Sequence, residues 1–151
     1  MHIIEDTRQK STKHAQKHSD WKESGDVVLR CKLPYGDYAK PPEIAVDTKA
    51  GLQEIAINLC GSAAERKRVA AEEELAQKLN GKLIFLVEQE GVESMRDLIG
   101  MQIVLGSGKV IKGEQLMIAM ENHTHKYGSE FTFCAPSEAG RKVKALLEGG
   151  S

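Results

Sequence analysis

Residues 82–88, Lys-Leu-Ile-Phe-Leu-Val-Glu, constrain the fold of this chain more than any other segment. Five consecutive apolar residues stand between a lysine and a glutamate. A run of this kind is typical of a strand that is covered on both faces, whereas a half-exposed strand alternates apolar and polar residues. We therefore expect a β-sheet that has this strand in its interior.

The rest of the chain divides into short strands and helices, with a change of period after residue 49. Strands are predicted at 2–6, 26–33, 43–49 and 130–134. Helices are predicted at 10–23, 52–60, 63–79, 113–126 and 137–148, and 91–108 is interpreted as a short helix with a turn. Strands first, then strands alternating with helices, indicate an α/β fold with a central mixed β-sheet flanked by helices on both faces.

Length and composition favour one globular domain at residues 1–148, followed by a frayed C-terminal tail at 149–151. The three cysteines, Cys31, Cys60 and Cys134, are far apart and fit neither a disulfide framework nor a metal or redox motif. No apolar run is long enough for a membrane span, and the N-terminus lacks the apolar stretch of a signal peptide. We expect a cytoplasmic protein that does not enter membranes.

The residues that suggest chemistry are Asp37, which follows Gly36, and Asp47-Thr48-Lys49, which begins ten positions later. Asp47 and Lys49 are two apart on a predicted strand and project from the same face, while Asp37 lies at the neighbouring turn. Two carboxylates can hold Mg²⁺, which activates water for phosphodiester hydrolysis, and an ammonium can orient that water or offset charge on the phosphate. By spacing alone, the same residues also fit a surface ion pair.

The flanking motifs resemble the nuclease domain of the XPF-type branch of the PD-(D/E)XK, or restriction-endonuclease-like, superfamily. That branch has a strand reading V-D-x-R-E, then G-D-Y, an E-R-K strand, a helical arginine and a strand like L-L-I-E. Residues 4–9 resemble the first element, 36–38 match the second, 46–49 occupy the third and 83–88 resemble the last. Arg68 stands twenty positions before Glu88, about where the family has its helical arginine.

The resemblance implies a Mg²⁺-dependent DNA endonuclease, with Mn²⁺ as a substitute, that cleaves branched or flapped DNA in recombination or repair. Asp37 and Asp47 are expected to be direct metal ligands, with the Thr48 carbonyl as a third. Lys49 is expected to orient the attacking water and Asp6 to be an auxiliary acidic residue. A homodimer is also expected, because XPF-type domains pair and because 113–120 and 143–147 offer apolar residues beyond the needs of one core.

Several departures from the family pattern leave alternatives open. Asp47 replaces a glutamate, Thr48 an arginine and Gln9 a glutamate, and Gln53 stands where an aspartate is expected. The changes at 9 and 53 put a second metal in doubt and motivate a different hypothesis, a catalytically inactive nuclease-fold module for DNA binding or dimerisation. The near-neutral net charge of −1 suggests, more weakly, a protein-interaction domain. At 151 residues, the chain is expected to lack the tandem helix-hairpin-helix domain of many relatives, so substrate choice is not expected to be inherited from them.

Four basic residues are predicted to meet DNA phosphates: Lys10, Lys13, Lys17 and Arg68. The first three lie in the predicted helix at 10–23, whose only bulky apolar residue is Trp21. Arg68 falls in the stripe Ala64, Arg68, Ala71, Glu72, Leu75 and is expected to face inward. There it either pairs with Glu72 at i,i+4 spacing or acts in catalysis by supporting the active site.

Two further features are given an ordinary interpretation. His123 and His125 have no cysteine or carboxylate cluster at ligand spacing, so they are expected to favour the helix dipole or a phosphate rather than zinc. Residues 106–109, Gly-Ser-Gly-Lys, lack the pattern of a phosphate-binding loop and are predicted to be a turn. No nucleotide cofactor is expected.

Overall fold

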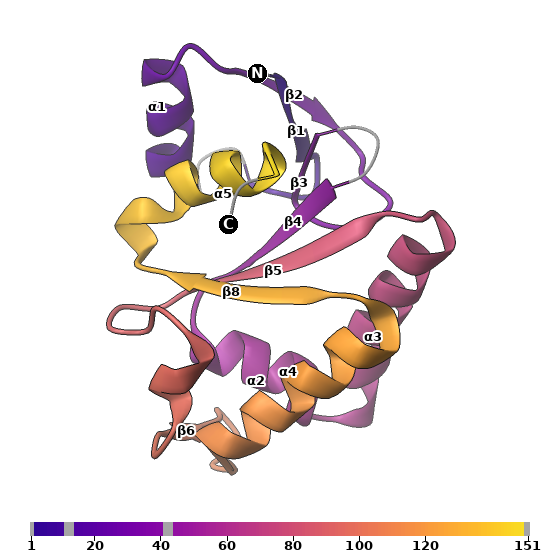
Figure 1. Ribbon diagram of the computed structural model, residues 1–151, viewed down its shortest axis with the longest axis vertical. Coiled ribbons are helices and arrows are strands. Elements are labelled where there is room, and N and C mark those ends of the chain that lie inside the picture. Colours follow the sequence, from indigo (N-terminus) through magenta and orange to yellow (C-terminus); the bar gives the residue numbers. More distant parts are fainter. Residues whose placement is uncertain (1, 11–13, 41–43, 150–151) are drawn as a thin grey trace.

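The computed structural model describes residues 2–10, 14–40 and 44–149. Its main sheet has six strands in the order β2-β1-β3-β4-β5-β8 (Figure 1). The strands are β1 His2–Asp6, β2 Val27–Cys31, β3 Tyr38–Lys40, β4 Ile44–Lys49, β5 Lys82–Glu88 and β8 Glu130–Cys134. β1 pairs parallel with β2 and antiparallel with β3, which pairs antiparallel with β4, while β4, β5 and β8 run parallel. The predicted mixed sheet is confirmed.

Helices cover both faces of this sheet (Figure 1). α1 (Ala15–Glu23) and α5 (Ala139–Leu147) lie on one face, and α2 (Leu52–Cys60), α3 (Ala63–Lys78) and α4 (Gly113–Tyr127) lie on the other. β5 supplies both cores: Phe85 and Val87 pack with α2 and α4, whereas Ile84 and Leu86 pack with Trp21 and α5. The apolar run at 83–87 is therefore buried on both sides, as its composition predicts.

The break between α2 and α3 falls at Gly61 and Ser62. A Cβ at Gly61 would lie 2.3 Å from the Ile57 carbonyl oxygen, so a larger residue does not fit there. The Ser62 hydroxyl then accepts the Glu65 backbone N–H and caps α3. This cap fixes where α3 begins and hence which of its residues face the sheet.

Three predictions about elements are wrong. The first helix spans Ala15–Glu23 rather than residues 10–23: residue 10 lies outside it, and residues 11–13 lie outside the described part of the chain. The predicted strands leave out residues 38–40, where β3 lies. The region 91–108 contains a 3-10 helix, Met95–Leu98, and then strand β6 (Gln102–Val104), which pairs with β7 (Val110–Lys112). Strands of three residues are too short to show a period of two.

The buried face of α3 also differs from the predicted apolar stripe. Its buried residues are Val69, Glu73 and Ala76, while Leu75 and Leu79 are exposed. A charged residue occupies the inward side because α4 and the start of β8 supply partners for it, as the hydrogen bonds of Glu73 show. None of the described helices combines the length and the apolar character that crossing a membrane requires.

Candidate active site

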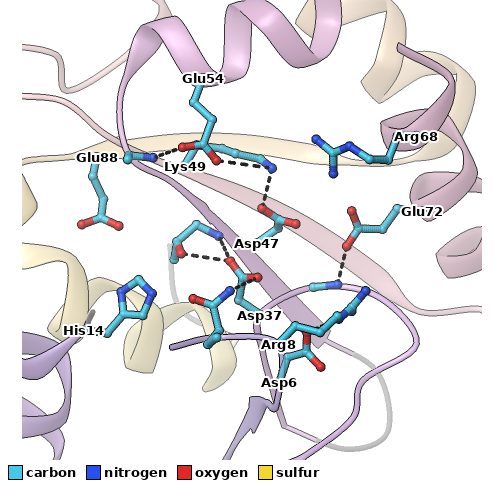
Figure 2. Close-up of a pocket in the computed structure, with 14 residues that line it drawn as sticks. Asp6, Arg8, His14, Asp37, Asp47, Lys49, Glu54, Arg68, Glu72 and Glu88 are labelled. Carbon is cyan, nitrogen blue, oxygen red and sulfur yellow. Dashed lines mark hydrogen bonds and ion pairs between the residues drawn. The ribbon is translucent and has the colours of Figure 1, made fainter. Parts of the chain in front are cut away.

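A pocket of about 270 Å³ opens beside the C-terminal ends of β4 and β5 (Figure 2). Among the described residues, its walls carry six carboxylates and three side chains of arginine or lysine. The carboxylates are Asp6, Asp37, Asp47, Glu54, Glu72 and Glu88, and the cations are Arg8, Lys49 and Arg68. An excess of carboxylates in a partly closed site is costly unless protons or cations balance it.

The turn before β3 brings Asp37 to β4. The Asp37 N–H donates to the Val46 carbonyl at 2.9 Å, and the Asp37 carbonyl accepts the Asp6 N–H at 2.7 Å. Gly36 has a φ of +75°, and a Cβ there would lie 2.8 Å from the Ala45 Cβ. Glycine is therefore required at 36, both for the left-handed backbone and for the close approach to β4.

Three donors hold the carboxylate of Asp37. Its Oδ2 accepts the Thr48 N–H at 2.8 Å and the Thr48 hydroxyl at 3.0 Å. Its Oδ1 accepts the side-chain amide of Gln9 at 2.7 Å. Each carboxylate oxygen has two lone-pair sites, so the bonds from the described residues leave one open site, on Oδ1.

Asp47 and Lys49 project from the same face of β4, as their spacing predicts, and form an ion pair of 2.9 Å between Nζ and Oδ1. The Lys49 ammonium also lies 3.9 Å from Glu54 and 5.7 Å from the ring centre of Phe85. Burial disfavours the charged form of Lys49, but Asp47 outweighs this effect, so the pKa of Lys49 is raised. Lys49 stays an ammonium whose donors are aimed at the pocket's acids.

Burial and the excess of negative charge raise the pKa values of two carboxyl groups in the pocket. Burial, followed by the charge of Asp47, raises the pKa of Asp37 to about 7 even though Thr48 and Lys49 act in the opposite direction. Burial and Asp47 likewise raise the pKa of Glu72 to about 7. Glu72 also accepts the Gly36 N–H at 2.6 Å, so it supports the turn that carries Asp37. Near neutral pH, Asp37 and Glu72 therefore carry fewer than two negative charges between them.

The donor set fits a hard divalent cation. Asp37 and Asp47 supply carboxylate oxygens, and the Thr48 carbonyl leaves β4 on the same edge as the Thr48 N–H that reaches Asp37. Oxygen donors of this kind are those that Mg²⁺ prefers. Within the described part of the chain, no group of three His, Cys, Asp or Glu side chains is arranged to hold a metal ion by side chains alone.

Arg68 lines the pocket, but its side chain is 57% exposed and does not face inward as predicted. It pairs with Glu65 at 2.9 Å, three positions earlier, rather than with Glu72. The reason is the orientation of α3, which buries Val69 and Glu73 and leaves Arg68 at the pocket's rim. At the rim, the guanidinium of Arg68 is accessible to a molecule that lies across the mouth of the pocket.

The proposed DNA-binding lysines separate in the structure. Lys17 is only 6% exposed, and its ammonium lies 3.0 Å from Glu88 Oε2 and 3.2 Å from His14 Nδ1. In this position it neutralises Glu88 and is not available to a phosphate on the surface. Lys10 is exposed, and Lys13 lies outside the described residues.

The other singled-out residues also find places. Asp6 lines the pocket but is pinned by Arg8 and by the Leu33 N–H, the latter at 3.0 Å. Gln53 points away and donates to the Val104 carbonyl at 2.8 Å. His123 pairs with the buried Glu73 at 2.6 Å, while His125 is exposed.

Sequence reasoning missed Glu54 and Glu72 as pocket residues, and it did not connect His14 with the site. Glu54 follows Lys49 by five positions at the start of α2, and its only signal is its closeness in sequence to the motif. Glu72 was considered solely as a partner for Arg68. Nothing local marks His14, because α1 meets the pocket only through the packing of distant segments.

No protein-family model matches the chain, and no curated protein matches it in sequence. By structure it belongs to the class of mixed α/β proteins with the XPF-type nuclease fold. Solved structures with a similar fold include XPF from Aeropyrum pernix and XPF from Aeropyrum pernix in complex with DNA. The TM-scores are 0.69 and 0.68 at 19% and 18% sequence identity, over 99% and 97% of this chain. The chain covers 66% and 63% of the length of those two chains.

Proposed function

We propose that the protein is a Mg²⁺-dependent endodeoxyribonuclease that cleaves branched or flapped DNA. The observation that carries this proposal is the convergence of Asp37, Asp47 and Lys49 in a pocket with more carboxylates than cations. The shared fold supports it, since one of the similar structures named above was solved with DNA. Branched or flapped substrates are the finest part of the proposal and rest on the XPF-type motifs.

The chain's own residues divide the work of hydrolysis. Asp37, Asp47 and the Thr48 carbonyl would hold the cation, which supplies Lewis acidity to the phosphate and lowers the pKa of water. Lys49 orients the attacking water and offsets charge as the new P–O bond forms and the old one breaks. One proton of that water ends on the leaving oxygen. Asp6 keeps Arg8 beside the pocket, and Arg68 at the rim contacts the DNA backbone.

The test is cleavage of a panel of linear, flapped and four-way DNAs in Mg²⁺ or Mn²⁺. Asp37→Asn and Asp47→Asn change charge with almost no change in shape, so both variants are expected to fold and to lose cleavage. Glu74→Gln, an exposed change on α3, is the control and is expected to cleave like the parent. Cleavage by both asparagine variants at the parent's rate would place the active site elsewhere.

An inactive DNA-binding or dimerisation module remains the second candidate. The observation in its favour is that Gln9 and Gln53 stand where the related pattern has acids, and Gln53 faces away from the pocket. The same panel separates the two candidates, because the inactive module binds branched DNA without cutting it in either metal.

We also propose a homodimer, and the structure changes which surface would form it. Val143 and Leu147 are buried in the core and cannot contribute. Apolar side chains remain 47–61% exposed just after the 3-10 helix, on the β6–β7 hairpin and on α4: Ile99, Val104, Val110 and Ile118. Light scattering should show a dimer that Ile118→Glu weakens, and a monomer at high micromolar concentration would count against pairing. Residence in the cytoplasm remains part of the proposal.

A further inference from the structure

The clamp on Asp37 is built from two residues that the resemblance marks as departures. Gln9 stands where a glutamate is expected, and Thr48 where an arginine is expected. In the structure, both side chains donate to the same carboxylate, Gln9 to Oδ1 and the Thr48 hydroxyl to Oδ2. Two departures that converge on one functional group point to a shared role.

The chemistry of the two replacements is consistent. A glutamate at 9 would be an acceptor facing another acceptor, in a pocket that already holds six carboxylates, whereas the amide of Gln9 is a donor. At Thr48 the hydroxyl joins its own backbone N–H on Oδ2, and together they fill both lone-pair sites of that oxygen. The carboxylate therefore cannot rotate without losing bonds on both oxygens.

The other acids of the pocket contrast with this arrangement. Asp6 is held by Arg8 and the Leu33 N–H, and Glu88 is held by Lys17. Each of these two acids has a cation as a partner, which neutralises it in place. Asp37 instead receives donors without a net charge on each oxygen, which orient it while leaving its charge for a cation.

We infer that Gln9 and Thr48 are positioning residues that fix Asp37 so that it binds a small divalent cation through Oδ1 alone. This inference rests on the proposed metal site. Hydrogen bonds to a ligating carboxylate set its orientation and basicity, and losing one typically costs 10–100-fold in metal affinity. An orienting role predicts weaker metal binding in variants that remain folded.

The test is Mn²⁺ binding to the full chain, measured by isothermal titration calorimetry and by the electron paramagnetic resonance signal of free Mn²⁺. Gln9→Met removes the amide at similar length, and Thr48→Val removes the hydroxyl but keeps the branched shape. We expect Gln9→Met to lower the affinity on the order of 10–100-fold. Thr48→Val should lower it less, because the Thr48 N–H remains, and Thr48→Ser should recover most of that loss.

The control is Gln77→Met, which removes an exposed amide that donates to the Lys126 carbonyl and does not line the pocket. It should bind Mn²⁺ like the parent. Thermal unfolding in EDTA identifies any variant whose loss is one of folding. If Gln9→Met and Thr48→Val fold and bind Mn²⁺ with the parent's affinity, the positioning role of Gln9 and Thr48 is wrong and the metal site stands. If the parent itself binds no Mn²⁺, the proposed metal site is wrong as well.

Discussion

Glu72 and Glu73 are neighbours on α3, yet they lie in opposite surroundings. Glu73 is fully buried, and its two oxygens accept from Ser129 at 2.8 Å and pair with His123 at 2.6 Å. Glu72 faces the pocket, accepts the Gly36 N–H and lies close to Asp47, which helps to raise its pKa to about 7. Each carboxylate oxygen of Glu73 has a hydrogen-bonding partner, whereas the carboxyl group of Glu72 lies beside a second acid, Asp47.

The difference distinguishes a structural acid from a functional one. A buried carboxylate that serves the fold is provided with donors, because an unsatisfied charge in the interior is expensive. A carboxylate that binds a cation lies beside other acids, although the repulsion between them destabilises the fold when no cation is bound. The predictions below probe the pocket side and the structural side in turn.

The largest effect is expected on the pocket side, from Lys49→Ala. Lys49 is the ammonium that balances Asp47, and its loss should slow DNA cleavage on the order of 10²–10⁴-fold, the range of one positioned catalytic group. Metal and DNA binding should persist, which initial rates together with binding isotherms would show. Lys67→Ala, an exposed change on α3, serves as the control, and an equal loss in both variants would refute the assignment.

On the structural side, Glu73→Ala should destabilise the fold. It leaves Ser129, and His123 beside it, without their buried acceptor, at a cost of about 1–3 kcal/mol per unsatisfied group. Glu72→Ala should cost less, because water can reach the Gly36 N–H through the pocket and the repulsion with Asp47 disappears. Urea denaturation in EDTA measures the free energy of unfolding of both variants. Equal losses in Glu73→Ala and Glu72→Ala would contradict the distinction between a structural and a functional acid.

The pH dependence of stability tests the pocket without any metal. Asp37 and Glu72 have ordinary carboxyl pKa values in the unfolded chain and values of about 7 in the fold, so the folded protein binds more protons between those limits. The contribution of Asp37 and Glu72 to the free energy of unfolding is therefore fully present at low pH and is lost as the pH rises to about 7. Thermal unfolding in EDTA from pH 4 to pH 8 should show the decline, and Asp37→Asn should flatten it. A slope unchanged in that variant would contradict the pKa assignment.

The smallest effect concerns the rim of the pocket. Arg68→Ala should reduce the dependence of DNA affinity on salt by about one unit in the log–log slope, the amount expected for one phosphate contact. Arg141→Ala, on α5 at the opposite face of the sheet, should leave the slope unchanged. Lys17 is buried against Glu88, so the salt slope should not report it as a phosphate contact. Fluorescence anisotropy at several salt concentrations measures these slopes.

The sequence predicted what depends on neighbouring residues. The run at 83–87 announced a strand buried on both faces, and the two-residue spacing placed Asp47 and Lys49 on one side of β4. It failed where a charged residue faces inward. Hydrophobic periodicity assigns Glu73 and Lys17 to the surface, but their partners His123 and Glu88 lie 50 and 71 positions away. No local pattern carries that information, so the orientation of α3 and the burial of Lys17 required the tertiary structure.

The capped start of α3 limits how this chain can change in length. Successive helical residues are about 100° apart, so the same helix points Glu72 into the pocket and Glu73 towards α4. One residue inserted between Ser62 and Glu72 would rotate the later residues past the sheet and set the two acids in the wrong surroundings. The β6–β7 loop carries no pair of residues of this kind. Insertions should therefore be tolerated in the β6–β7 loop but not in α3. Related chains should therefore vary in length at the loop and keep a constant count of ten residues from the cap to Glu72.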